Sequence, residues 1–365
     1  METIAADSRM ESRNLRRQTR RRHWLKRGVV FLFSALLSLV SVELVVRGYV
    51  YCRGWTSNCY VGSITLLVPD PMNGYTLAED YRFRSGAQKI SINRFGLRGP
   101  AVEEVRPMGT HRVAVIGGSS VFGYLVSDGE EACRVLENRL RSNGDSVEVL
   151  NGGVPGYNLI QSSRRFDSHI SRLEPDVVIL YLGWNDLVYL LDETPSIDVA
   201  GRGLCASTLE RMAAYSTLYG LVAHRLLGQV AEFNPPSHSG TQPTPAGSRL
   251  FQTALQSTVS RVRQSGAEVI ICSQAMLAHP EVGESAKLHL AGRGSSADHT
   301  IALGVWLQDA LALFATANDI PFVDAYNEIP PTSAMLGDVI HLTVQGESEL
   351  AAIWERELTA IWAQQ

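Results

Sequence analysis

The chain has 365 residues, of which 45% are hydrophobic and 19% charged, and this balance suits a globular protein with a sizeable core. Its formal net charge of −4 conceals an asymmetry, because nine Lys and Arg residues lie within the first 27 positions. The remainder is therefore clearly acidic, which argues against a nucleic-acid-binding surface on the folded body.

The basic cluster precedes a strongly apolar stretch. Gly28–Val46 contains 19 residues and one charged side chain, Glu43. As a helix it is roughly 28 Å long, close to the hydrocarbon thickness of a bilayer. Arginines on its amino side predict that this end stays in the cytoplasm and that the body is exported. The sequence thus predicts a disordered basic cytoplasmic tail over 1–27, a single-pass anchor in the inner membrane over 28–46, and a periplasmic body.

Three other interpretations of this stretch are possible. A buried core helix fits poorly beside so much positive charge, and no convincing small-x-small cleavage site for a signal peptide follows the apolar run. Arg21–Lys26 resembles a twin-arginine export signal, but in so arginine-rich a segment the match is weak. An uncleaved anchor is the favoured interpretation.

The five cysteines do not form a metal-binding pattern. Cys52 and Cys59 lie seven positions apart just outside the predicted membrane segment, where they either pair as a disulfide or remain free thiols. Cys272 lies in an apolar strand pattern and is expected to be a small buried residue. Because no CxxC or HExxH motif occurs, we predict neither a metal nor another cofactor.

Residues 47–110 have turn signals at Pro69–Pro71 and at Asn73-Gly74, and they are expected to form an extracytoplasmic linker. Within them, Ser91–Gly99 (SINRFGLRG) predicts a short strand and turn that acts as a lid or edge over the core domain, residues 111–365.

From Arg112 onward, candidate strands alternate with helical patterns, which favours a parallel sheet covered by helices on both faces. Two segments interrupt the alternation: Phe233–Ser248 is expected to be an exposed loop, and Ala278–Ala297 to lie over the catalytic edge. With five strands, the flavodoxin-like order 2-1-3-4-5 is the natural expectation. The strand candidates are Arg112–Ile116, Val147–Leu150, Val177–Leu182, Glu268–Cys272 and Phe322–Asp324, and the helical patterns cover about 130–142, 158–173, 207–229, 248–265, 300–317 and 346–362.

Short polar motifs follow the first three strands. The first strand leads into Gly117-Gly118-Ser119, the second into Asn151–Gly156, and the third into Gly183–Asp186. In a parallel sheet these loops emerge at the same carboxyl edge, and in the predicted order the first strand lies between the other two. A fourth motif, Asp338–His341, precedes the last helix. The loops are therefore expected to converge around Ser119.

This set of side chains suits nucleophilic catalysis. A serine hydroxyl is a poor nucleophile until a base takes its proton, and His341 is the best candidate for that base. Asp338 is close enough on one turn to orient the imidazole. The backbone N–H groups of Ser119 and Gly156 and the amide of Asn185 are candidate donors to an oxyanion.

Each residue also has a purely structural interpretation. Ser119 is a possible helix cap, Gly156 an ordinary loop glycine, and Asn185 a turn residue. The Asp338–His341 pair also fits a cap followed by a surface histidine. Four such accidents in the required order and positions are much less probable than one catalytic site.

Together these blocks resemble the SGNH hydrolase superfamily, the GDSL-type lipases and esterases, from about Arg112 to the C-terminus. The resemblance implies a three-layer α/β/α fold and metal-free hydrolysis of acyl esters. It assigns the nucleophile to Ser119, the oxyanion donors to Gly156 and Asn185, and the base with its carboxylate to His341 and Asp338. Membrane-tethered members with a segment like SINRFGLRG before the first block are also familiar.

One position departs from the family pattern. Gly118 stands where the family usually has aspartate, which leaves the local hydrogen bonding undefined and makes Ser120 a rival to Ser119. The leading hypothesis is a membrane-anchored esterase that acts on acyl esters of glycans or lipids. Two alternatives remain: a glycan O-acyltransferase with the same residues, and an inactive membrane-tethered binding module.

Overall fold

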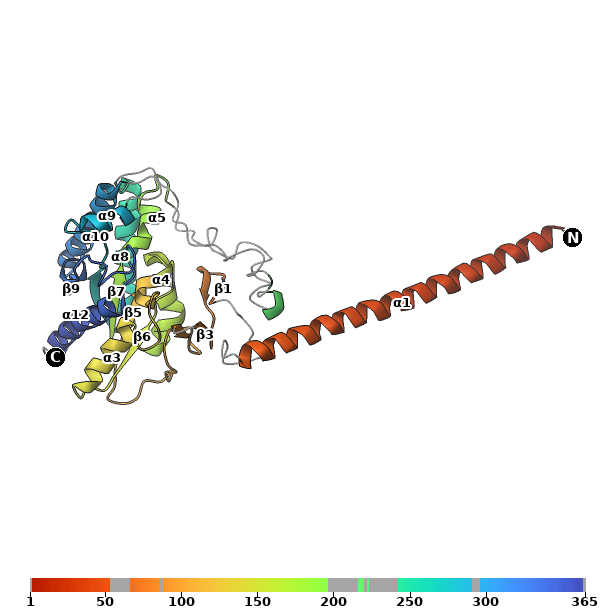
Figure 1. Cartoon of the computed structure of the whole chain (residues 1–365), viewed down its shortest axis with the longest axis horizontal. Coiled ribbons are helices and arrows are strands. Elements are labelled where there is room, and N and C mark those ends of the chain that lie inside the picture. The colour runs from red at the N-terminus through yellow and green to blue at the C-terminus, as the bar shows by residue number, and fades with distance from the viewer. Residues whose placement is uncertain are drawn as a thin grey trace.

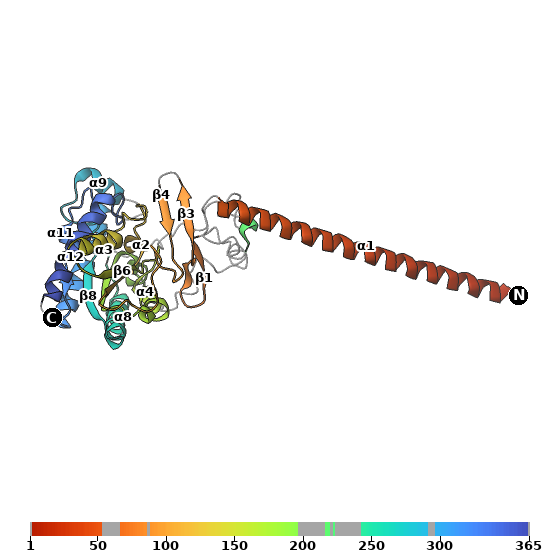
Figure 2. The ribbon, with the colours of Figure 1, turned by 90° about the horizontal axis from the view of Figure 1, so that it is seen from below.

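A long helix leads into an α/β body in the computed structural model of the chain (Figure 1). Helix α1 spans Glu2–Cys52, and two β-hairpins lie between its end and the body (Figure 2). The structure describes residues 2–52, 66–85, 88–195, 216–219, 222, 242–290 and 296–363.

The body is built on a five-stranded sheet in the order β6-β5-β7-β8-β9, and all four strand pairs are parallel. This confirms the predicted 2-1-3-4-5 order. In β5 every residue after His111 is buried, as expected of a central strand covered on both faces. The strands are β5 (His111–Gly117), β6 (Val147–Asn151), β7 (Val177–Leu182), β8 (Glu268–Ser273) and β9 (Phe322–Val323).

Helices cover both faces of the sheet, which confirms the three-layer α/β/α fold. Successive residues of β5 point to opposite faces, so that Val113 and Val115 join one apolar cluster and Ala114 and Ile116 the other. The first cluster is completed by α3 (Ala132–Ser142) and α12 (Val344–Trp362), and the second by α4 (Leu159–Arg165), α8 (Pro245–Gln264) and α10 (Ala297–Ala317).

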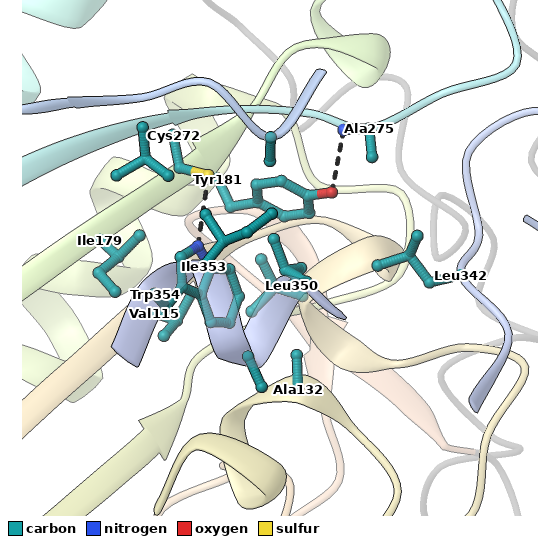
Figure 3. Close-up of a cluster of buried hydrophobic side chains, with 14 of the residues drawn as sticks. Val115, Ala132, Ile179, Tyr181, Cys272, Ala275, Leu342, Leu350, Ile353 and Trp354 are labelled. Atoms are coloured by element: carbon teal, nitrogen blue, oxygen red, sulfur yellow. Dashed lines mark hydrogen bonds between the residues drawn. The ribbon is translucent and has the colours of Figure 1, made fainter. Parts of the chain in front are cut away.

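Two polar contacts are built into the first cluster (Figure 3). The indole N–H of Trp354 donates to Cys272 Sγ at 3.3 Å, and the hydroxyl of Tyr181 accepts the N–H of Ala275 at 3.1 Å. Cys272 is fully buried, as its apolar surroundings in the sequence predict. Large aromatic side chains are thus accommodated without leaving their polar atoms unsatisfied.

Most helical patterns appear near their expected positions, with local differences. Within the pattern over 158–173, α4 ends at Arg165, and the chain continues as a π-helical turn (Phe166–Ile170) and a 3₁₀ turn (Ser171–Leu173). The segment after β8 contains a short helix, α9 (Glu284–Leu290). The helix expected over 207–229 lies almost entirely outside the described residues, as do most of the loop before α8 and the pairing partner Cys59.

The segment before the sheet forms two hairpins, β1–β2 (Leu67–Asp70, Gly74–Leu77) and β3–β4 (Arg82–Ser85, Gln88–Ser91). An isolated two-stranded hairpin is marginally stable, so these need a partner surface. They find it on the body, where a third apolar cluster joins hairpin side chains to residues of the loops after β5 and β6. Ser91–Gly99 then runs beside β6 through an antiparallel bridge between Arg98 and Asn151, which extends that edge of the sheet.

Helix α1 includes the predicted apolar segment. The span Arg22–Val50 is long and apolar enough to cross a membrane, and none of its most apolar window is buried. Among the described helices α10 also meets this criterion, but it packs on the sheet. The expectation of disorder over 1–27 is wrong in the structure, since α1 continues through this segment, whose Arg and Glu residues favour helix.

The single acidic residue of the apolar segment has several partners. The carboxylate of Glu43 accepts hydrogen bonds from Arg47 Nε at 2.6 Å, from Ser216 Oγ at 2.9 Å and from the Thr217 N–H at 2.8 Å. The described residues of the segment between β7 and β8 therefore contact the C-terminal half of α1.

Candidate active site

The first site residue stands where β5 turns into the four-residue helix α2 (Ser119–Phe122). A Cβ on Gly117 would lie 2.3 Å from the Tyr181 carbonyl oxygen, so only glycine lets β5 and β7 approach this closely. Gly118 makes the turn, and Ser119 follows at the carboxyl edge of the sheet with 7% of its surface exposed. The Gly-Gly pair thus brings a serine hydroxyl to the edge where α/β proteins bind ligands.

Two polar side chains from the far end of the chain reach this serine. His341 Nε2 lies 2.7 Å from Ser119 Oγ although the residues are 222 positions apart, and His341 Nδ1 lies 2.6 Å from Asp338 Oδ2. The other carboxylate oxygen of Asp338 accepts the N–H groups of Ile340 at 3.0 Å and of His341 at 2.8 Å. The aspartate therefore fixes both the backbone turn and the imidazole ring.

The carboxyl of Asp338 is held in its ionised form. Burial alone would raise its pKa, but hydrogen bonds and charge from His341 and the two backbone N–H groups outweigh burial and lower it. An ionised acceptor at Nδ1 favours the tautomer with its proton on that nitrogen. The lone pair of Nε2 then faces the Ser119 hydroxyl, which is the arrangement a general base needs.

The amide of Asn185 lies beside Gly118. Its Nδ2 donates to the Tyr157 carbonyl at 2.8 Å, which leaves its second N–H for another acceptor. A Cβ built on Gly118 would lie 2.4 Å from this Nδ2 and 3.0 Å from the Tyr157 oxygen. The glycine that departs from the family pattern thus makes room for the asparagine amide, because any side chain there would displace it.

Gly156 belongs to the loop after β6 and has a φ of +82°, a conformation that favours glycine. Within the described residues its N–H donates to no acceptor. The hairpin β1–β2 supports this loop, because the Tyr75 hydroxyl donates to the Pro155 carbonyl at 3.0 Å and the Tyr157 hydroxyl donates to the Tyr75 carbonyl. The structure thus joins Ser119, His341 and Asp338 by direct hydrogen bonds and positions Gly156 and Asn185 through their loops.

The neighbouring serine has a different environment. Ser120 is 4% exposed, donates to the Ile340 carbonyl at 3.0 Å and accepts from Gln274 Nε2 at 2.7 Å. Its hydroxyl is engaged in the protein interior, so the structure gives no support to Ser120 as a rival nucleophile. The sequence motifs did not single out Gln274. The one available signal was its position directly after β8, at the same edge of the sheet.

Two further side chains near the site were also missed. The ring of Tyr124, about half exposed, lies 4.9 Å from the ring of His341 at an interplanar angle of 31°. Arg98, from the segment expected to be a lid or edge, is 2% exposed and donates to the carbonyls of Phe122 at 2.6 Å and Val126 at 2.7 Å. These contacts hold the end of the turn that begins at Ser119.

Among the residues that the structure describes, no cluster of three or more His, Cys, Asp or Glu side chains is arranged to hold a metal ion. The polar groups around Ser119 are instead one nucleophile, one base with its carboxylate, and N–H donors. This set can support acyl transfer through a serine.

Comparisons with solved structures find similar folds at low sequence identity. A lipase/acylhydrolase from Enterococcus faecalis is 16% identical, with 68% of this chain and 96% of that chain covered and a TM-score of 0.41. An acetyl-xylooligosaccharide esterase from Geobacillus is 16% identical, covering 68% and 93%, with a TM-score of 0.42. Esterase EstA from Pseudoalteromonas sp. is 12% identical, covering 70% and 100%, with a TM-score of 0.43.

No curated protein sequence matches the chain. The model of the GDSL-like lipase/acylhydrolase family matches residues 115–348, well over half of the chain. This region begins within β5, just before Ser119, and ends within α12, just after His341. The chain therefore belongs to the GDSL-like lipase/acylhydrolase family and is a carboxylic ester hydrolase.

Proposed function

We propose that the protein is a membrane-tethered serine esterase that works through an acyl intermediate on Ser119. The single observation that carries this proposal is the position of His341, whose two ring nitrogens lie 2.7 Å from Ser119 Oγ and 2.6 Å from Asp338 Oδ2. An imidazole held between a carboxylate and a hydroxyl accepts the hydroxyl proton as the oxygen attacks.

The reaction then has two halves. In the first, His341 Nε2 takes the proton from Ser119, whose Oγ attacks the ester carbonyl carbon, and the imidazolium returns the proton to the departing alcohol. In the second, water loses a proton to His341 and attacks the acyl carbon, and the proton returns to Ser119 as the acid leaves. Asp338 stabilises the imidazolium in both halves.

The negative oxygen of each tetrahedral intermediate needs donors on one side. We assign the Ser119 N–H, the Gly156 N–H and the second N–H of Asn185 Nδ2 to this role. Ser119 is the first residue of α2, so its N–H has no acceptor within the helix. Because one oxyanion donor contributes about 100- to 1000-fold to the rate, we expect Asn185→Ala to lower kcat by that factor in hydrolysis of p-nitrophenyl acetate.

The tether is α1. Its exposed apolar span and the arginines before it favour an uncleaved anchor with a cytoplasmic amino end and a catalytic domain, residues 111–365, on the periplasmic side. A tethered enzyme meets esters close to the membrane surface, so acyl esters of glycans or lipids are the substrates that this arrangement favours.

A serine-directed probe tests the proposal. We expect a fluorophosphonate to label the purified full-length protein at Ser119, and Ser119→Ala to abolish both labelling and hydrolysis of p-nitrophenyl acetate. Ser142→Ala is the matched control, because Ser142 is an exposed serine that bonds only to its own helix, and it should behave as the unmodified protein. Hydrolysis that survives Ser119→Ala would refute the assignment.

A further inference from the structure

Gln274 is a buried polar residue for which the proposed mechanism has no use. It directly follows β8, so it lies at the same sheet edge as Ser119, and it is 7% exposed. Both ends of its amide are occupied: Oε1 accepts the Trp184 N–H at 3.0 Å, and Nε2 donates to Ser120 Oγ at 2.7 Å.

Trp184, Gln274, Ser120 and Ile340 form a chain of hydrogen bonds, and the donor and acceptor of each bond are determined. The Trp184 N–H can only donate, so the amide oxygen of Gln274 must face it and the NH₂ group must face Ser120. Ser120 Oγ already accepts from that NH₂ group, and its own proton therefore points to the Ile340 carbonyl, 3.0 Å away. No member of the chain can be reversed without leaving a buried donor or acceptor unpaired.

Three residues of this hydrogen-bond chain are sequence neighbours of the proposed catalytic residues. Trp184 precedes Asn185, Ser120 follows Ser119, and Ile340 precedes His341. The three loops leave different strands or precede α12, and this chain of hydrogen bonds links all three.

We infer that Gln274 is a positioning residue that holds the nucleophile, the asparagine donor and the base in register. The inference rests on the proposed function. Displacement of a catalytic group by about 1 Å can cost about 100-fold in rate, so loss of these hydrogen bonds should lower kcat by about 10- to 100-fold. KM should change by no more than about 2-fold, because Gln274 lies behind the reacting groups rather than among them.

Two substitutions distinguish the loss of these hydrogen bonds from the loss of buried side-chain volume. Gln274→Met keeps the size of the side chain and removes both contacts. Gln274→Glu keeps the acceptor for Trp184, but its carboxylate cannot donate and instead draws the Ser120 hydroxyl away from Ile340. We expect both to lower kcat, and we expect only Gln274→Glu to regain activity relative to the unmodified protein as the pH falls and its carboxyl becomes protonated.

A double-mutant cycle with Ser120→Ala tests the connection. We expect Ser120→Ala to lower kcat as Gln274→Met does, and the double variant to lose no more than either single one. Gln308→Met is the matched control, because Gln308 of α10 is 8% exposed and its Nε2 donates to Asp324 Oδ1 at 2.7 Å rather than to any of the three loops. It should lower the melting temperature but leave kcat unchanged.

The results are read on the full-length protein by fluorophosphonate labelling rate, kcat and KM, with the melting temperature recorded for each variant. A Gln274→Met protein that labels and turns over like the unmodified one would overturn the inference, and so would effects of Gln274→Met and Ser120→Ala that multiply. Absence of Ser119-dependent labelling in the unmodified protein would instead refute the proposed function, so the two failures are distinguishable.

Discussion

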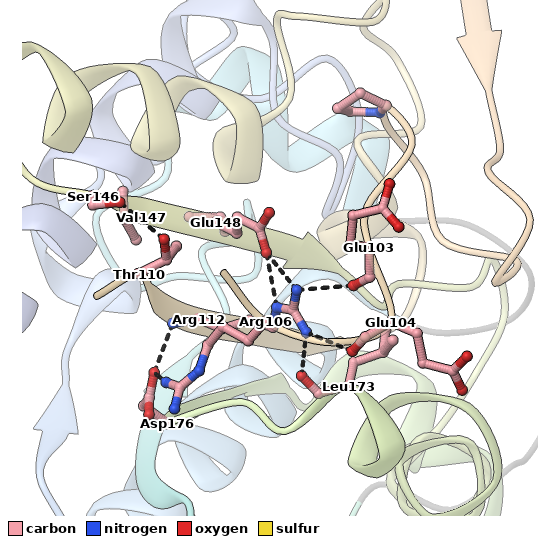
Figure 4. A network of polar contacts seen from close by, with 12 residues as sticks. Glu103, Glu104, Arg106, Thr110, Arg112, Ser146, Val147, Glu148, Leu173 and Asp176 are labelled. Atoms are coloured by element: carbon pink, nitrogen blue, oxygen red, sulfur yellow. Dashed lines mark hydrogen bonds and ion pairs between the residues drawn. The ribbon is translucent and has the colours of Figure 1, made fainter. Parts of the chain in front are cut away.

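Two buried arginines lie at opposite ends of the sheet. Arg112, at the amino end of β5, is fully buried and donates to Glu148 Oε2 at 2.6 Å from Nη2 and 2.9 Å from Nε, and to the carbonyls of Glu103 and Leu173 (Figure 4). Arg106 pairs with Asp176 in the same network, and Asp176 also accepts the Arg112 N–H at 2.7 Å. At this end each arginine is paired with a carboxylate, and the guanidinium of Arg112 also donates to backbone carbonyls.

Arg98, at the carboxyl end, is bound differently. Its NH₂ groups donate to carbonyls of the Ser119 turn, its nearest carboxylate is Asp128 at 3.6 Å, and its Nε is buried without a hydrogen-bond partner. A buried charge that is only partly satisfied contributes little to net stability. We infer that the polar network at the amino end of the sheet contributes mainly to stability, whereas Arg98 at the carboxyl end mainly holds the loop after Ser119 in position.

The largest effect is expected at the carboxyl end. Asp338→Asn preserves the size of the side chain but favours the wrong tautomer of His341, so kcat should fall by about 10,000-fold. The melting temperature should change little, since Asp338 is partly exposed. Steady-state kinetics and thermal unfolding of the same preparation provide both values, and a variant that unfolds early without losing turnover would contradict the comparison.

At the amino end we expect a loss of stability instead. Arg112→Met leaves the Glu148 carboxylate without its partner, which should lower the free energy of unfolding by about 3–5 kcal/mol. Denaturant unfolding measures this, and the kcat of the folded fraction should stay unchanged. Arg94→Met is the control: Arg94 pairs with Glu103 on the surface, where an ion pair contributes about 0–1 kcal/mol.

A smaller effect should separate the two arginines directly. Arg98→Lys keeps the charge but cannot donate to several carbonyls in a planar fork, so the turn after Ser119 should loosen and kcat should fall by about 10-fold. Arg112→Lys should lower stability but leave kcat unchanged. Equal effects of the two substitutions on kcat would remove the functional distinction between the ends.

The last effect concerns pH, and it is small at any one pH step. Burial raises the pKa of Glu347 to about 8, despite a hydrogen bond from the Ala132 N–H and the nearby charge of Arg98. The carboxyl of Glu347 therefore keeps its proton in the folded state at pH values above 4.5, the ordinary pKa of glutamate, where the unfolded chain releases it. Stability should fall as the pH rises between these two values, by at most about 1.4 kcal/mol per pH unit.

Glu347→Gln should flatten this dependence. Thermal unfolding from pH 5 to pH 9 should show the variant close to the unmodified protein at pH 5 and more stable than it at pH 8. Glu349→Gln, at an exposed position of the same helix, should leave the dependence intact. If Glu347→Gln leaves the slope unchanged, the carboxyl is ionised in the folded state at neutral pH.

The sheet could be predicted because its signals are local. Val177–Leu182 is a continuous apolar run that matches β7 at both ends, and glycines at the ends of β5, β6 and β7 mark the loops that follow them. The Asp338–His341 spacing was sufficient to anticipate the contact between those side chains, because three residues form a single turn. The catalytic roles of Ser119, Asp338 and His341 remain predictions.

The supporting residues could not be predicted because their partners, backbone groups and one hydroxyl, lie far away in the chain. Arg98 binds carbonyls 24–28 positions later, and Gln274 binds a hydroxyl 154 positions earlier. Carbonyl oxygens and N–H groups occur at almost every position, so the sequence gives no indication of which will be used. The sequence indicates only a linker where the hairpins lie for a similar reason, since Tyr75 contacts a loop that lies far away in the chain.

The four residues at the nucleophile, Gly117 to Ser120, differ from the letters G-D-S-L at the second and fourth places. Each of these two changes coincides with a contact to another loop: Gly118 admits the Asn185 amide, and Ser120 reaches the Ile340 carbonyl. Which residues fit at these two positions of the motif thus depends on loops that are distant in the sequence. Substituting either residue should therefore disturb a loop far away in the sequence, the asparagine loop for Gly118 and the loop before His341 for Ser120.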